Sequence, residues 1–182
     1  MVTEEEDSLN EKMKEANISL VINNYNDIFS SFDARTFTEK ALSVDFLDEC
    51  KRAAREKGNS VELRILVPKN IRNQREEWKI KKRLKNHFEH HSKIEEREIS
   101  SIKREGYSWF GLGTIFILAV SWLHTKEFNN FAITVLSTML EPAGWFSFWE
   151  GLGKVFIIAR EKKPEYEFYK KMSKAEINFA NY

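Results

Sequence analysis

Two groups of side chains in this sequence have the types and the spacing that chemistry requires. The first lies in "HFEHH", where His87 and His91 are four residues apart and Glu95 follows one turn later, so all three would share one helical face. Imidazole and carboxylate groups at this spacing could hold zinc or another divalent cation. The alternative is a solvated face on a helix rich in Glu and Lys. We prefer that alternative and expect no cofactor.

The second group is a charge pair inside an apolar stretch. Residues 141–160 read "EPAGWFSFWEGLGKVFIIAR" and carry Glu150 and Lys154. Each charge alone would cost about 2.5–3.5 kcal/mol near the centre of a bilayer. However, Glu four residues before Lys is the favoured order for an ion pair on one helix face. We therefore expect an intramembrane polar pair that faces protein instead of lipid.

Other patterns do not indicate an enzyme. The sequence has no glycine-rich phosphate loop and no serine elbow, and Cys50 falls on the apolar side of its helix. The basic run over 79–85 is interpreted as a solvated helix face, because contact with anionic headgroups would require a bend, for example at Gly106. The formal net charge of +1 gives no general argument for nucleic acid. We expect a protein that neither catalyses a reaction nor binds nucleic acid.

A small α/β domain is expected at the two ends of the chain. The predicted elements are a strand over 17–22, a helix over 44–57, a strand over 61–67 and a last strand over 175–182. The order strand, helix, strand predicts a crossover between parallel strands. The domain would occupy 17–73, completed by 164–182, after a flexible acidic segment over 1–16.

A charged stalk helix is expected over 74–106, followed by a transmembrane hairpin over 107–159. The stalk is rich in Glu, Lys and Arg, and its apolar stripe is narrow. Residues 107–123 then contain no formal charge, which is enough to span a bilayer. The hairpin region also holds most of the tryptophans of the chain.

Two interpretations of the second span compete. In one, residues 131–150 form a continuous helix, which places Glu141 near the bilayer midplane. In the other, 127–140 form an amphipathic helix on the outer surface and the span covers 142–159, beginning at Pro142 in the first helical turn. We prefer the second interpretation, because the polar positions before Pro142 follow helical spacing and Glu141 then lies at a helix N-terminus, where negative charge is favoured.

The distribution of basic residues predicts the topology. Between the spans lies only Lys126, whereas basic residues flank both outer ends of the hairpin: Lys93, Arg97, Lys103 and Arg104 before it, and Arg160, Lys162, Lys163, Lys170 and Lys171 after it. The positive-inside rule then puts both termini in the cytoplasm. We expect a multi-pass protein of the cytoplasmic (inner) membrane.

A short signature resembles a known family. The segment "AGWFSFWEGLGKVF" (143–156), after an earlier span and the N-terminal α/β pattern, resembles a family of uncharacterised prokaryotic two-span membrane proteins. In many relatives an Arg-Pro pair follows the second tryptophan and an acidic residue comes soon after, whereas this chain has Glu150 first and Lys154 later. The resemblance implies the architecture and no activity. With the glycines that would allow close approach of the spans, the expected packing residues are Gly111, Gly113, Gly144, Trp145, Trp149 and Gly151.

The sequence thus predicts an α/β membrane protein: a small cytoplasmic α/β domain, a long charged helix and a two-helix transmembrane hairpin. The function we expect is non-enzymatic, a membrane-tethered module for binding, scaffolding or sensing. Its partners would be the lipid bilayer, further copies of the chain in a homo-oligomer and an unknown cytoplasmic partner. The alternative is an oligomeric transport or conduction component that uses Glu150 and Lys154.

Overall fold

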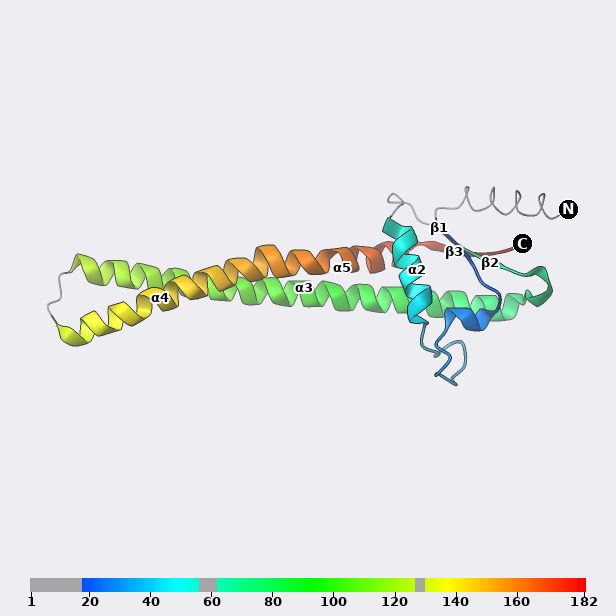
Figure 1. Ribbon diagram of the computed structural model, residues 1–182, viewed down its shortest axis with the longest axis horizontal. Coiled ribbons are helices and arrows are strands. Elements are labelled where there is room, and N and C mark those ends of the chain that lie inside the picture. The colour runs from blue at the N-terminus through cyan, green and yellow to red at the C-terminus, as the bar shows by residue number, and fades with distance from the viewer. Residues whose placement is uncertain (1–17, 56–61, 127–129) are drawn as a thin grey trace. The chain divides into compact units, whose positions relative to one another are not determined.

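The computed structural model describes residues 18–55, 62–126 and 130–182, and is mostly helical with one small sheet (Figure 1). The predicted flexible segment 1–16 lies outside the described residues. The chain divides into two compact units. The first contains the described residues up to Lys93 together with Tyr166–Tyr182, and the second contains Ile94–Glu165.

The sheet of the first unit has three parallel strands in the order β1-β2-β3. These are β1 (Ile18–Val21), β2 (Glu62–Val67) and β3 (Glu176–Asn181). In register, Leu63 of the central strand lies between Ile18 and Ile177. The parallel pairing of the first two strands and the return of the C-terminal strand to the same sheet are confirmed.

The core of the first unit combines this sheet with helical side chains. Helix α2 (Val44–Arg55) contributes Phe46, Cys50 and Ala54. Burial raises the pKa of the Cys50 thiol to about 12, so this thiol stays protonated and packs as an apolar group. The last two residues of the helix predicted over 44–57 lie outside the described residues. Two short 3₁₀ helices, Tyr25–Ile28 and Lys69–Ile71, complete the unit.

The predicted charged helix packs in part on the sheet of the first unit. It belongs to helix α3, which runs unbroken from Gln74 to Thr125 and shows no bend at Gly106, where contact of the basic run with headgroups would require one. Its first turns bury Ile80, Leu84 and Phe88 completely in the core of the first unit. A narrow apolar stripe was therefore enough to cover a small sheet, and the α/β unit extends to Lys93 instead of ending at residue 73.

A second long helical stretch begins at Phe131. Helix α4 (Phe131–Gly153) continues through a π-helical segment (Lys154–Ile158) into α5 (Ala159–Lys174). Pro142 lies inside α4. The expected helix start at Pro142 is therefore wrong: residues 131–153 form one helix that contains Pro142 in its interior, as the alternative interpretation has it. The placement of residues 127–140 and 142–159 relative to a membrane stays a prediction.

Candidate functional site in the helical hairpin

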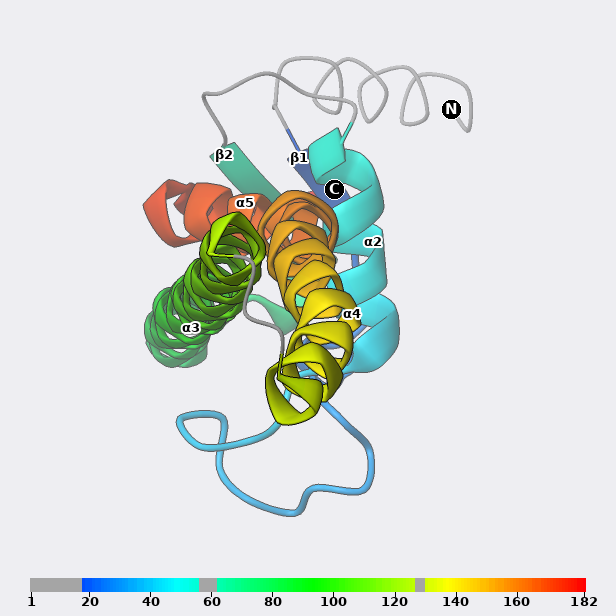
Figure 2. The same cartoon turned by 90° about the vertical axis from the view of Figure 1, so that its left-hand side faces the viewer.

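The two long helices of the second unit meet along a seam of small residues. Buried positions recur every seven residues, at Gly106, Gly113 and Val120 on α3 and at Ser137, Gly144 and Gly151 on α4. Within residues 94–153 the helices run side by side and antiparallel, as Figures 1 and 2 show. A seven-residue repeat is the spacing that keeps one face of a helix against its neighbour.

Backbone atoms touch across this seam. A Cβ atom added at Gly113 would lie 2.7 Å from the Gly144 carbonyl oxygen and closer still to the backbone nitrogen of Phe148. A Cβ atom at Gly151 would lie 2.6 Å from the Gly106 carbonyl oxygen. Only glycine permits an approach this close, and small residues at helix contacts are typical of pairing in membranes.

The outer surface of the hairpin is apolar. Large apolar side chains outside the seam are exposed: Phe131 is 84% exposed and Trp149 is 62% exposed. Further exposed apolar side chains are Leu112, Ile115, Leu118, Trp122, Leu136, Met139, Trp145, Phe146, Phe156 and Ile157. A hairpin folded in water would bury more of these large apolar side chains. In this hairpin they are exposed, whereas the small residues Gly113, Ser137 and Gly144 are buried at the helix contact.

One helix has the composition of a membrane span. Among the described residues, α3 is the helix that is long and apolar enough to cross a membrane, and 17% of its apolar stretch is buried. That low burial differs from the core helix of a soluble protein, which would be mostly covered. Helix α4 carries Glu141 and Glu150 and does not pass the same test within the described ranges.

The predicted pair Glu150–Lys154 is part of a larger cluster. Lys154 Nζ lies 3.0 Å from Glu105 Oε1 on α3 and 3.4 Å from Glu150 Oε1. The Lys154 side chain is 19% exposed, whereas the Glu105 and Glu150 side chains are 56% and 40% exposed. A second cross-helix pair joins Lys162 to Glu98 at 2.7 Å. The sequence identified the partner on the same helix and missed Glu105, which is distant in sequence.

The expected packing residues have different environments. Gly113, Gly144 and Gly151 lie in the seam, but a Cβ atom at Gly111 would meet no described atom within 4 Å, so Gly111 does not pack against the other helix. Trp145 and Trp149 are exposed on the outer surface instead of packing between the spans. Sequence reasoning missed Gly106 as a seam residue, although its seven-residue distance from Gly113 was a usable signal.

The histidine cluster belongs to the first unit. The rings of His87 and His91 are 4.3 Å apart between centroids, and His91 stacks on Tyr169 at 5.0 Å. Burial, with the nearby positive charges of His91, Arg83 and His90, lowers the pKa of His87 to about 4. Glu95, the third proposed ligand, falls in the other unit. Within the described residues, no group of three or more His, Cys, Asp or Glu side chains could hold a metal ion.

Comparison with known protein families, with curated proteins and with solved structures finds no match to this chain. The resemblance to the two-span family therefore stays a prediction. The function must be argued from the geometry of the two units.

Proposed function

We propose that this chain is an integral membrane protein, with the apolar part of α3 and the whole of α4 as a transmembrane hairpin and the α/β unit in the cytoplasm. The observation that carries this proposal is that large apolar side chains of the second unit are exposed, while small residues form its helix contact. Glycine and serine lie at the helix contact, while aromatic and aliphatic side chains face outward. Lipid tails provide the surroundings in which that arrangement is favourable.

The length of α4 fits a bilayer. Its 23 residues rise about 34 Å at 1.5 Å per residue, slightly more than a hydrocarbon core of about 30 Å. The cluster of Glu105, Glu150 and Lys154 then lies at the cytoplasmic boundary, where water and headgroups reach it. This placement lowers the cost of a charge pair that the sequence alone had put deep in the membrane.

The orientation follows from the basic residues. Lys103, Arg104 and Arg160 flank the cytoplasmic end of the hairpin, whereas Lys126 is the one basic residue between the two spans. The positive-inside rule places both termini in the cytoplasm, in a multi-pass protein of the inner membrane. The α/β unit would then be a tethered, non-enzymatic module for binding, scaffolding or sensing, with a cytoplasmic partner.

Two measurements test the membrane assignment and its orientation. The first is extraction of membranes with alkaline carbonate, in which the full chain should stay with the lipid. The second uses Lys126→Cys and, as the matched control, Lys174→Cys. A membrane-impermeant maleimide should label Lys126→Cys in intact cells and Lys174→Cys only after lysis. Release by carbonate would overturn the membrane assignment, and the reverse labelling pattern would overturn the topology.

The alternative function is that of an oligomeric conduction component. The position of Glu141 supports this alternative. Glu141 is exposed, and within the described ranges no hydrogen bond or ion pair joins its side chain to another residue. Ten residues into α4, it would lie about 15 Å from the outer end, near the bilayer midplane. Light scattering in detergent tests this function. A monomer would contradict this function, because two spans cannot enclose a pore. A defined oligomer should conduct ions, and Glu141→Leu should abolish this ion flux.

A further inference from the structure

A groove follows one face of α3 where its charged part meets its apolar part. Its volume is about 420 Å³, and it is lined by Ser101, Arg104, Glu105, Ser108, Trp109 and Leu112. Polar side chains occupy one end and Trp109 and Leu112 the other. In the proposed hairpin this groove lies at the cytoplasmic boundary, where headgroups meet acyl chains and tryptophan is enriched.

Two polar side chains of the groove already have a partner inside the hairpin. Glu105 accepts a hydrogen bond from Lys154 Nζ at 3.0 Å. Ser108 Oγ donates to the Arg104 carbonyl oxygen at 3.0 Å. The carboxylate and this hydroxyl are therefore occupied, and Lys154 offsets the negative charge of Glu105.

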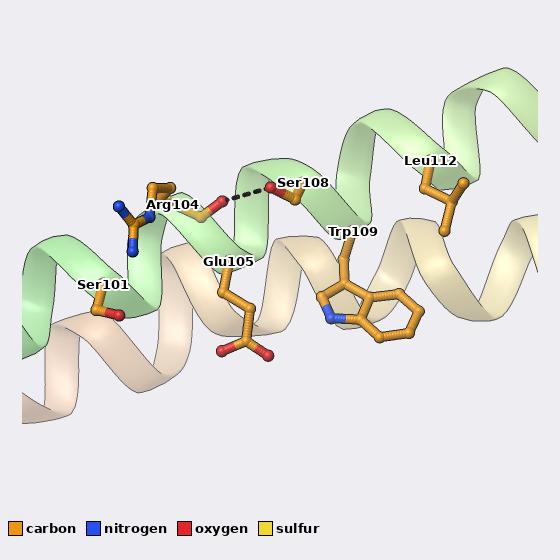
Figure 3. A pocket seen from close by; sticks show the side chains of 6 residues that line it. All are labelled: Ser101, Arg104, Glu105, Ser108, Trp109 and Leu112. Carbon is orange, nitrogen blue, oxygen red and sulfur yellow. Dashed lines mark hydrogen bonds between the residues drawn. The ribbon is translucent and has the colours of Figure 1, made fainter.

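The guanidinium of Arg104, in contrast, has no such partner among the described side chains. Within the described ranges no hydrogen bond or ion pair joins it to another side chain, and the same holds for the hydroxyl of Ser101 one turn earlier. Figure 3 shows the guanidinium turned away from the Glu105 carboxylate, while Glu105 and Trp109 project to the same side of α3. The groove thus presents a planar five-donor group and one hydroxyl with no internal acceptor.

We propose that this groove binds the phosphodiester of a membrane phospholipid, an inference that rests on the proposed membrane function. A phosphate oxygen pair matches the guanidinium fork of Arg104 in charge and in geometry. Ser101 would donate a further hydrogen bond, and the glycerol and upper acyl chain would lie against Trp109 and Leu112. Lipid phosphate is the anion present at this depth in quantity.

The experiment measures lipid binding by native mass spectrometry of the full chain in detergent, with phosphatidylglycerol and phosphatidylcholine as probes. Arg104→Gln removes the guanidinium fork. Lys103→Gln is the matched control, because it removes one positive charge at the same depth from a residue that does not line the groove. Arg104→Lys keeps the charge without the fork. Circular dichroism verifies that each variant retains its helix content.

We expect Arg104→Gln to weaken binding of both lipids about tenfold to a hundredfold. Lys103→Gln should weaken only phosphatidylglycerol, by about fivefold or less, and Arg104→Lys should restore binding in part. Equal losses in Arg104→Gln and Lys103→Gln would overturn the site. Competition by millimolar inorganic phosphate would overturn the lipid source in favour of a soluble phosphate ligand. The two proposals can fail independently. Carbonate extraction tests the membrane assignment, whereas the lipid site is tested by binding in detergent.

Discussion

Gly113 gives the sharpest test of the helix contact, through its replacement by alanine. The added Cβ would meet the Gly144 carbonyl oxygen at 2.7 Å and the Phe148 Cα at 2.8 Å. These are backbone atoms, which cannot rotate away as the end of a side chain can. The two helices of the hairpin must therefore separate, which loosens contacts along the whole seam.

Gly111→Ala is the matched control for this substitution. It changes the same residue type two positions away in α3, where a Cβ atom meets no described atom within 4 Å. Both variants gain helix propensity, worth up to about 1 kcal/mol for alanine over glycine. Only Gly113→Ala adds overpacking, which costs about 1–3 kcal/mol in a well-packed contact. The propensity gain cancels between the variants, so their free energies of unfolding should differ by about 1–3 kcal/mol.

The assay is unfolding of the full chain in mild detergent by titration with dodecyl sulfate, followed by circular dichroism. Gly111→Ala should unfold at the same or a higher dodecyl sulfate fraction than the original chain, and Gly113→Ala at a clearly lower one. Equal midpoints for the two variants would refute the close approach of α3 and α4 at this glycine.

Three further predictions concern polar contacts. His87 has a folded-state pKa of about 4 against about 6.5 when unfolded, so its stabilising contribution is complete above pH 6.5 and is lost as the pH falls toward 4. Denaturant unfolding should therefore give a lower free energy of unfolding at pH 4.5 than at pH 7, and His87→Phe should reduce this difference. Tyr25→Phe removes the 2.8 Å bond to the Glu77 carboxylate and should lower the free energy of unfolding by about 1–2 kcal/mol, whereas exposed Tyr107→Phe should not change it. Lys154→Met leaves two facing carboxylates, so it should lower the dodecyl sulfate midpoint, and adding Glu105→Gln should recover part of the loss.

The α/β unit was largely predictable because its elements follow local rules. The strands alternate or run apolar between turn residues, and the buried positions of α2 recur at helical spacing. The limit of this unit was less visible. Charged residues surround Ile80, Leu84 and Phe88, so their stripe resembled a solvated stalk, and only the sheet packed against them identifies these positions as core.

Helix α4 shows where local rules mislead. Proline favours a first helical turn and disfavours a helix interior, which argued for a break before Pro142. In a membrane helix, however, neighbouring groups can satisfy the carbonyl that proline leaves without a donor, so the penalty is smaller than in water. The pairing of Lys154 with Glu105 was hidden for another reason. It joins residues on two helices, and only the register fixed by the glycine seam brings them together.

The continuity of α4 also changes which charged residue would be the most costly to place in a membrane: Glu141 instead of the pair Glu150–Lys154. If α4, which is continuous from Phe131, crosses the membrane as proposed, Glu150 and Lys154 would lie at the cytoplasmic boundary and Glu141 near the middle of the span. A lone charge there costs about 2.5–3.5 kcal/mol on an insertion scale. The seam would not relieve this cost, because the Glu141 side chain is exposed although the neighbouring positions Ser137 and Gly144 are buried. Only protein or water outside the single hairpin could then lower the cost of the Glu141 charge. A second copy of the chain could provide a polar contact or enclose water at this position. The mass of the protein in detergent is therefore informative for both proposed functions.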